Sequence, residues 1–301
     1  MINKLDDILK EAQKRGKKKL AVAYAEDSHT LEAVNDAAEM GIIEPILVGN
    51  LENIKRVCED EGIDYRKFTI IEEDGDVNCV NRAVRMVNQG QADLLMKGLV
   101  STDKYMRGIL NKEYGLLPPK GVLSHVTVMQ IPAYHKLLLV SDVAIIPYPD
   151  FSQKVAIAKY LISTAKALGI NKPKVACIAP SEQLLPGVIS STEAALIAKM
   201  GDRGQIPGAL IDGPLAFDVA INKEVVETKK LSGSPVAGDA DCLLMPNIDA
   251  ANVFFKTITN FAGGELAAMV VGTKVPCILT SRGDSRKSKL NSIALACLSA
   301  K

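Results

Sequence analysis

The sequence lacks the residue spacings that mark a metal site or a disulfide framework. Its three histidines are His29, His125 and His135, and they form no HxxxH or related ligand pair. The cysteines form no CxxC pair, so we expect reduced, structural thiols. They lie far apart along the chain: Cys58, Cys79, Cys177, Cys242, Cys277 and Cys297. We therefore expect no metal ion.

The sequence also has no excess of charge of one sign and no long apolar run. Its 36 basic and 35 acidic residues nearly cancel, whereas a nucleic acid or an anionic membrane selects a positive field. The richest apolar stretch, residues 137–147, is interrupted by Asp142 and is shorter than the roughly 20 residues of a membrane-spanning helix. No signal-peptide pattern opens the chain. We expect a cytoplasmic protein that binds neither nucleic acid nor membrane.

Two common nucleotide-binding motifs are absent as well. No GxGxxG follows a predicted strand, and no GxxxxGK[ST] precedes a predicted helix. Both absences argue against a Rossmann-type dinucleotide site and against a Walker-type phosphate loop. Any anion site must therefore be built in another way.

The sequence does contain an alternation of short apolar runs with longer amphipathic stretches, which is typical of β-α units in a parallel sheet. With 301 residues and 48% hydrophobic content, the chain is long enough for two domains. In its first part the predicted strands are residues 20–25, 45–48, 68–71 and 92–96, and the predicted helices are residues 30–40, 51–61, 77–88 and 102–110.

The pattern changes in the middle of the chain. Two β-rich runs, residues 122–130 and 136–146, have no long helix between them, and we interpret them as the crossover between domains. Farther on, the predicted helices are residues 153–168, 192–200 and 286–298, and the predicted strands are residues 174–178, 209–211, 242–245 and 275–279. We predict an α/β fold with two domains that meet along a cleft: residues 1–136 with a C-terminal helix of about 286–301, and residues 137–285.

The segment TSRGDS, residues 280–285, follows a predicted strand and precedes the last helix. Loops at the carboxyl ends of parallel strands are where α/β folds bind ligands. Arg282 offers a planar fork for two phosphate oxygens, Ser281 offers a hydroxyl, and the start of the helix offers free N–H groups. Alternatively, Asp284 or Ser285 only caps the helix.

Other polar segments also have a structural and a functional interpretation. The segment SSTE, residues 190–193, matches the capping pattern S-x-x-E, and we predict that it caps a helix. Asp212 follows a predicted strand and either belongs to a turn, which is the default, or presents its carboxylate to a ligand. Asn252 either fills a turn or donates to a carbonyl or phosphate oxygen.

Two residue pairs are further candidates. Lys97 and Gly98 end the fourth predicted strand, where a lysine either binds phosphate or is solvated. Ser124 and His125 lie in the β-rich run near the proposed domain junction, where a histidine is more often structural than catalytic. We retain both pairs, with Asp212 and Asn252, as candidate substrate-binding residues.

Several segments together resemble the phosphate acetyltransferase and butyryltransferase family. They are MKGLVST (96–102), GDRGQI (201–206), DGPLAFDVAI (212–221), VAGDADCLLMPNI (236–248) and TSRGDS (280–285). The resemblance covers nearly the whole chain. Within the family, MKGLVST, GDRGQI, LLMPNI and the LNSI of residues 290–293 look most like the butyryltransferase branch.

The resemblance implies two α/β/α domains around a cleft, similar to isocitrate and isopropylmalate dehydrogenases, and a homodimer. It implies the reaction of acyl-CoA and phosphate to acyl phosphate and coenzyme A, with coenzyme A as a substrate and no cofactor. The serine and arginine of the family's S-R-G motif line the phosphate and coenzyme A site. They correspond to Ser281 and Arg282 here.

The sequence departs from the family's pattern in two places. The acetyl branch has a catalytic aspartate seven residues beyond the motif serine, where this chain has Ser288. The base is therefore Asp284 or a residue outside the loop. The Gly-Asn pair that follows the LLMPNI-like strand in the family is Ala251-Asn252 here, which keeps Asn252 as a substrate-binding candidate.

Three alternative functions remain open at this point. A phosphate acetyltransferase differs only in acyl chain length, which leaves no readable motif because one methylene shifts discrimination by only about 1–3 kcal/mol. A metal- and NAD-dependent hydroxy-acid dehydrogenase of the same fold needs clustered aspartates, and Asp239 with Asp241 is the only candidate. A regulator that binds acyl-CoA or acyl phosphate without catalysis is the third.

Overall fold

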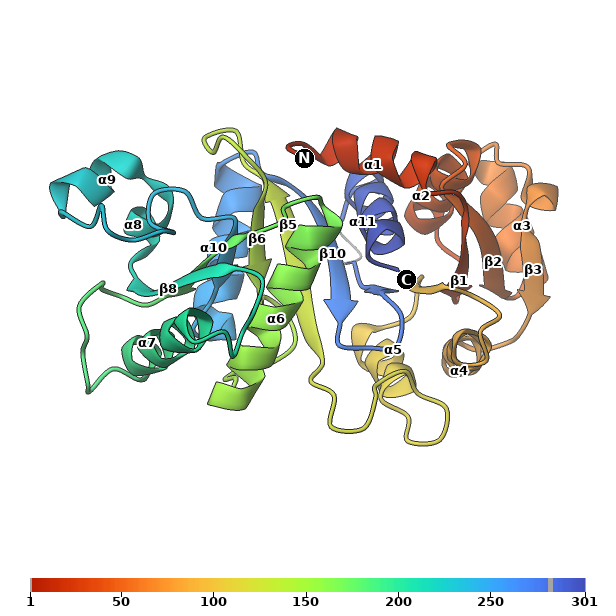
Figure 1. The fold of residues 1–301 in the computed structure, drawn as a ribbon. Coiled ribbons are helices and arrows are strands. Elements are labelled where there is room, and N and C mark those ends of the chain that lie inside the picture. The colour runs from red at the N-terminus through yellow and green to blue at the C-terminus, as the bar shows by residue number, and fades with distance from the viewer. Residues whose placement is uncertain (1, 281–283, 301) are drawn as a thin grey trace. The chain divides into compact units, whose positions relative to one another are not determined.

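The computed structural model describes residues 2–280 and 284–300 (Figure 1). The chain divides into two compact units. We call Asp6–Leu123 with Leu266–Lys301 the terminal unit, and Met1–Leu5 with Ser124–Glu265 the central unit. In Figure 1 the terminal unit has the red to yellow and the blue ends of the chain, and the central unit is mostly green and cyan.

The terminal unit begins with a regular alternation of strands and helices. Its elements up to the fifth helix are α1 (Leu5–Lys14), β1 (Lys18–Ala23), α2 (Ser28–Glu39), β2 (Ile43–Gly49), α3 (Leu51–Asp60), a 3-10 turn (Tyr65–Lys67), β3 (Thr69–Glu72), α4 (Asp76–Asn88), β4 (Leu94–Lys97) and α5 (Thr102–Ile109). The last part of the chain adds β10 (Glu265–Val271), β11 (Cys277–Ile278) and α11 (Arg286–Ser299).

The strands of the terminal unit lie in the order β3-β2-β1-β4-β11-β10. Neighbours pair in parallel except for β10 and β11. Residues 20–23 of β1 and all of β4 are buried, which is typical of parallel strands covered by helices on both faces. Helix α11 packs against α2, and α4 packs against α5; the two pairs lie on opposite sides of these strands in Figure 1.

Side-chain caps fix where several of these helices begin. Asp27, Asn50 and Ser101 precede α2, α3 and α5, and each side-chain oxygen accepts from the backbone N–H three residues on. Helix α4 follows Gly75, whose φ of 81° suits glycine. These local signals explain why the predicted and observed helix starts agree within one or two residues.

The central unit contains the second series of elements. They are β5 (Ser124–Gln130), β6 (Leu138–Ser141), α6 (Phe151–Ala167), β7 (Lys174–Ile178), α7 (Ile189–Asp202), β8 (Leu210–Leu215), α8 (Phe217–Ile221), α9 (Lys223–Thr228), β9 (Cys242–Leu244) and α10 (Ile248–Phe261). The strand order is β5-β6-β9-β7-β8, with only β5 and β6 antiparallel. Val140, Ala176 and Leu243 form part of the buried core, against which Phe254 and Phe255 of α10 pack.

The predicted α/β class is confirmed, with a mixed rather than a purely parallel strand arrangement. The compact units group three segments differently from the predicted domains, and the first is Met1–Leu5, which belongs with the central unit. Residues 124–136 belong with the central unit because β5 pairs with β6, and residues 266–285 belong with the terminal unit because β11 pairs with β4. The full domain assignment stays a prediction.

Two further observations concern the cysteine side chains and the length and apolar character of the helices. All six cysteines are free and buried, as expected of structural thiols. Among the helices of residues 2–280 and 284–300, none combines the length and the apolar character that a membrane span requires.

Candidate functional site

The carboxyl ends of three neighbouring strands meet in the terminal unit. Ala23 of β1 is paired with Lys97 of β4, and Ile278 of β11 is paired with Met96. These three strands run parallel, so the chain segments that follow them leave the sheet at the same edge. This is the edge at which α/β folds bind ligands. Lys97 ends β4 there, and Thr280, the first residue of the TSRGDS segment, follows β11 by two positions.

Lys97 and Gly98 shape the backbone at this edge. Lys97 is 3% exposed, and its ammonium donates to the carbonyl oxygens of Gly98 at 3.1 Å and Val100 at 3.0 Å. A Cβ on Gly98 would lie 2.2 Å from the carbonyl oxygen of Tyr24. Only glycine fits there without a backbone shift. Lys97 is thus buried and bonded, and the interpretation as a solvated surface lysine is wrong; its binding of phosphate stays a prediction.

The TSRGDS loop is described only at its two ends, because Ser281, Arg282 and Gly283 lie outside the described residues. Thr280 is 2% exposed. Ser285 is the N-cap of α11, and its Oγ accepts from the N–H of Ser288 at 3.2 Å. The capping interpretation is therefore confirmed for Ser285 and is compatible with a ligand-binding loop before it.

A buried lysine next to this loop was missed by sequence reasoning. Lys289 of α11 is 3% exposed, and its Nζ lies 3.1 Å from Oγ1 of Thr280. Burial lowers the pKa of Lys289, while the carboxylates of Asp27 and Asp284 act in the opposite direction. One feature of the sequence could have identified this residue. Lys289, Asn291 and Ser292 stand among many apolar residues in the last helix, and α11 buries all three.

In the central unit, Ser124 belongs to a buried polar cluster around Asp142, which sequence reasoning treated only as an interruption of an apolar run. The Oγ of Ser124 donates to Oδ2 of Asp142 at 2.9 Å. The same carboxylate accepts from three backbone N–H groups at 2.8–3.2 Å, those of Ala144, Ile145 and Ile146. Asp142 is 3% exposed, so these bonds offset the unfavourable burial of its charge.

His125 and Asn252 lie close to the same cluster. The Oγ of Ser141 donates to the carbonyl oxygen of His125 at 2.8 Å, and Nδ2 of Asn252 donates to the carbonyl oxygen of Val143 at 3.1 Å. Asn252 is exposed and lies in α10, whereas His125 is buried. The turn interpretation of Asn252 is therefore wrong. The structure brings Ser124, His125 and Asn252 together around residues 141–143.

Asp212 occupies different surroundings within the central unit. It lies inside β8, opposite Ala176 of β7, so Asp212 is a strand residue and not a turn residue. The strand continues to Leu215, which pairs with Ile178 after an irregularity in the register. Its carboxylate accepts from the Ser234 hydroxyl and from the N–H of Gly213. Neither of these two bonds involves the residues around Asp142.

The predicted capping box at residues 190–193 is also wrong. Helix α7 begins at Ile189, and its N-cap, Val188, makes no side-chain cap. The Oγ of Ser191 donates instead to the carbonyl oxygen of Gln183 at 3.0 Å. Glu193 forms an ion pair with Lys154, a lysine that is only 6% exposed. Glu193 is thus the ion-pair partner of the buried Lys154.

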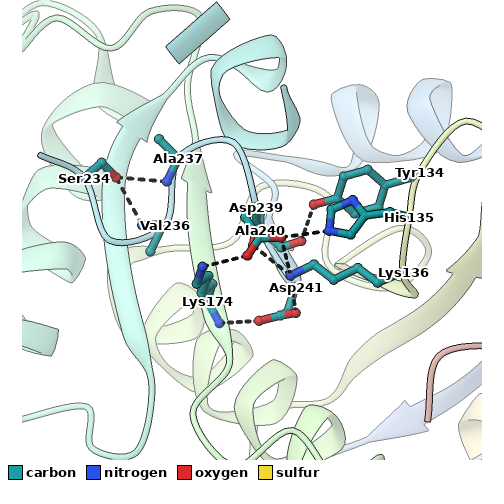
Figure 2. A network of polar contacts seen from close by, with 10 residues as sticks. All are labelled: Tyr134, His135, Lys136, Lys174, Ser234, Val236, Ala237, Asp239, Ala240 and Asp241. Atoms are coloured by element: carbon teal, nitrogen blue, oxygen red, sulfur yellow. Dashed lines mark hydrogen bonds and ion pairs between the residues drawn. The ribbon is translucent and has the colours of Figure 1, made fainter. Parts of the chain in front are cut away.

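The two aspartates required by the dehydrogenase alternative are already paired with lysines (Figure 2). Asp239 contacts Lys174 at 2.7 Å, Lys136 at 3.0 Å and His135 at 2.9 Å, and Asp241 contacts Lys136 at 2.6 Å. Burial alone would raise the pKa of Asp239, but hydrogen bonds from Lys174 and Lys136 hold it well below its usual value. Both carboxylates that the dehydrogenase alternative needs are therefore already paired with lysines.

The remaining acidic and thiol side chains offer no alternative cluster. Within residues 2–280 and 284–300, no three His, Cys, Asp or Glu side chains are grouped as metal ligands would be.

Comparison with known proteins identifies the family. The model of the phosphate acetyl/butaryl transferase family matches residues 4–81 and 75–297. The chain belongs to this family. The phosphate butyryltransferase of Clostridium acetobutylicum is 42% identical over 298 residues, which are 99% of this chain and 98% of that protein. The phosphate acetyltransferase of Thermotoga maritima is 38% identical over 296 residues, 97% of this chain and 98% of that protein.

A solved structure agrees with this assignment. The branched-chain phosphotransacylase of Enterococcus faecalis superposes with a TM-score of 0.83 at 30% identity, covering 94% of this chain and 98% of that one. The resemblance predicted from the sequence segments is confirmed. The protein is an enzyme of the acyltransferase class, as predicted.

Proposed function

We propose that this protein exchanges a short acyl group between coenzyme A and inorganic phosphate, and that butyryl-CoA is among its substrates. The observation that carries the proposal is the 42% identity to a phosphate butyryltransferase over 99% of the chain. Phosphate acetyltransferase is the second candidate, supported by the 38% identity to the Thermotoga maritima protein. The two activities differ only in the acyl pocket.

In the proposed reaction, the thiol of coenzyme A has a reference pKa of about 8.5 and loses its proton to a base. The thiolate attacks the carbonyl carbon of the acyl phosphate, a C–S bond forms, and the C–O bond to phosphate breaks. Ser281 and nearby N–H groups stabilise the oxyanion, and Arg282 neutralises the leaving phosphate. Asp284 is the proposed base.

The proposed substrate-binding residues differ in the exposure of their side chains and in the hydrogen bonds that these side chains form within the chain. Asn252 is exposed on α10 and uses Nδ2 for a bond to the carbonyl oxygen of Val143; its amide oxygen is the group that we propose contacts a substrate. Ser124 and Asp212 already bond within the chain. We propose that these two residues, with His125, act by fixing the backbone that a substrate contacts. Lys97 and Gly98 do the same at the end of β4.

Several wider expectations remain proposals of the same kind. We propose that the enzyme needs no metal ion or other cofactor, acts in the cytoplasm and forms a homodimer. We also propose that its two units correspond to the two α/β/α domains of isocitrate and isopropylmalate dehydrogenases. The lysine pairing of Asp239 and Asp241 supports metal independence, because it leaves those carboxylates without capacity for a divalent ion.

The decisive experiment measures phosphate-dependent release of free thiol from acetyl-, butyryl- and isobutyryl-CoA. We expect release from at least one of the longer substrates to exceed release from acetyl-CoA, and to stop when phosphate is omitted. Faster release from acetyl-CoA would favour the acetyltransferase. A folded protein that releases thiol from none of the three, or that does so without phosphate, would refute the proposed reaction.

A further inference from the structure

We propose that the central unit contains a second small-molecule site, which binds an α-amino acid with an aliphatic side chain. The site is an open pocket of about 420 Å³, a size typical of ligand pockets, which span about 300–1,000 Å³. One wall is formed by residues 133–135, between β5 and β6, and the other by residues 221–224, where α8 ends and α9 begins. Gly238 also lines the pocket. The inference does not depend on the proposed reaction.

The pocket lies where strands of the central unit begin. Residues 133–135 precede β6, and Gly238 precedes β9. Asp142 and Asn252, in contrast, follow the ends of β6 and β9. Because β6 and β9 pair in parallel, their beginnings share one edge of the sheet and their ends share the other. A ligand in the pocket is therefore separated by the length of the strands from the residues around Asp142.

Hydrogen bonds hold the walls of the pocket in place. The Tyr134 hydroxyl donates to the carbonyl oxygen of Ala240 at 2.7 Å (Figure 2). Nε2 of His135 lies 2.9 Å from Oδ1 of Asp239 in the same view. The N–H of Gly238 donates to a carbonyl oxygen of α8 at 2.8 Å, which connects the floor of the pocket to the second wall. Fixed walls reduce the ordering cost that a ligand meets on binding.

Two charged side chains of the pocket are available to a ligand. Lys223 and Glu224 are both exposed, and neither side chain forms an ion pair or hydrogen bond with another residue of 2–280 and 284–300. Oδ1 of Asn222 accepts from the backbone N–H of Glu224 at 2.9 Å, which leaves its Nδ2 as a donor. The pocket can therefore bind a carboxylate through Lys223 and Asn222, and an ammonium group through Glu224.

The balance of charge in the pocket favours a zwitterion. The neighbouring network in Figure 2 pairs two lysines with two aspartates, so their formal charges cancel. Lys223 and Glu224 then contribute one charge of each sign. A simple carboxylate is attracted by Lys223 but repelled by Glu224, and a simple amine meets the converse pair of forces. A ligand with both an ammonium and a carboxylate group gains from both residues.

The apolar residues of the pocket determine which kind of amino acid fits. Tyr134 and Ile221 are partly buried against the core of the central unit, and both line the pocket together with Ala133. An aliphatic side chain that covers these surfaces removes apolar area from water. A charged side chain would lose hydration there without that gain. We therefore use L-leucine as the probe of the site.

The test measures the binding of three ligands to the purified full-length protein by isothermal titration calorimetry. L-Leucine carries both charges, 4-methylpentanoate lacks the ammonium group, and 3-methylbutylamine lacks the carboxylate. Lys223→Met and Glu224→Gln each remove one charge of the pocket. Lys159→Met and Glu227→Gln are the matched controls, because both residues are exposed in the same unit and neither lines the pocket. Circular dichroism checks that each variant is folded.

We expect wild type to bind L-leucine about 10-fold more tightly than either analogue, at the lower end for a charge-assisted hydrogen bond because the side chains are exposed. Lys223→Met should bind L-leucine about 10-fold more weakly than wild type and no more tightly than it binds 3-methylbutylamine. Glu224→Gln should bind L-leucine no more tightly than 4-methylpentanoate. In each case the variant and the analogue remove the same contact. Both controls should bind L-leucine as wild type does.

The inference is overturned if wild type shows no binding of L-leucine at about 10 mM, a concentration that detects even weak ligands. It is also overturned if either analogue binds wild type as tightly as L-leucine does, or if both folded pocket variants keep the wild-type affinity. Should a pocket variant not fold, the comparison of the three ligands on wild type decides. Binding is measured without the reaction, so a protein that releases no thiol refutes the proposed function and leaves this test intact.

Discussion

Replacing Asp239 by asparagine removes the central anion of the network in Figure 2 while keeping the shape of the side chain. Lys136 keeps Asp241 at 2.6 Å as a partner, but Lys174 loses its contact with Asp239 at 2.7 Å. The Asp239 side chain is 25% exposed, so the effect falls below that of a fully buried pair. We expect a loss of about 1–3 kcal/mol in the free energy of unfolding at pH 7.

The pH dependence gives a second measurement of the same network. The folded-state pKa of Asp239 is depressed, so its stabilising effect is present above the unfolded-state pKa of about 3.9 and is lost as the pH falls through the folded value. The difference between wild type and Asp239→Asn should therefore be constant from pH 7 to about pH 5 and shrink below about pH 4.

Urea denaturation of both proteins, followed by circular dichroism across this pH range, provides the data. Asp202→Asn is the control, because Asp202 pairs with Lys199 on the surface with both side chains more than 60% exposed, and such pairs contribute about 0–1 kcal/mol. If Asp239→Asn is no less stable than Asp202→Asn at pH 7, the assignment of the network as a stabilising element is refuted.

The remaining predictions concern activity. Excess EDTA should leave the rate of thiol release unchanged; a loss that Mg²⁺ restores would favour the dehydrogenase-like alternative. Asp284→Asn should lower kcat by about 10²-fold or more, and an unchanged kcat would place the base elsewhere. Arg282→Lys should weaken the use of phosphate more than the use of acyl-CoA, because the charge remains but the two-pronged geometry is lost; equal effects on both substrates would contradict this role. Gly98→Ala should reduce both activity and melting temperature, because its Cβ would meet the Tyr24 carbonyl at 2.2 Å, whereas Gly187→Ala, with open space around it, should change neither.

Much of the fold could be predicted because local signals and tertiary packing agree. The predicted strand 174–178 coincides with β7, and the predicted helix 286–298 ends one residue before α11 does. Helix α10 was missed because it contains Val253, Phe254 and Phe255, residues with a preference for strands. Phe254 and Phe255 pack against the core of the central unit, and this packing overrides the local preference.

The candidate site was less predictable, because the roles of its residues depend on contacts between distant segments. Asp212 and Asn252 resembled turn residues, and only strand pairing and helix packing assign them to β8 and α10. Lys289 belongs to no motif, and its burial and its contact with Thr280 follow from the packing of α11. Sequence patterns identified the loop but not the buried charges around it.

Polar groups at the beginnings of strands and polar groups at the ends of strands have different roles in this protein. The first group stabilises the fold, and the second lies where ligands bind in such sheets. In the central unit, the network of Asp239 lies where β6, β7 and β9 begin, because Lys136 precedes β6, Lys174 opens β7 and Asp241 precedes β9. In the terminal unit, the buried Lys97 ends β4 and the buried Thr280 follows β11. Because ligands bind at the carboxyl ends of strands in such sheets, substitutions in the first group should change the free energy of unfolding with little effect on KM. Substitutions in the second group should change KM for phosphate at nearly constant stability.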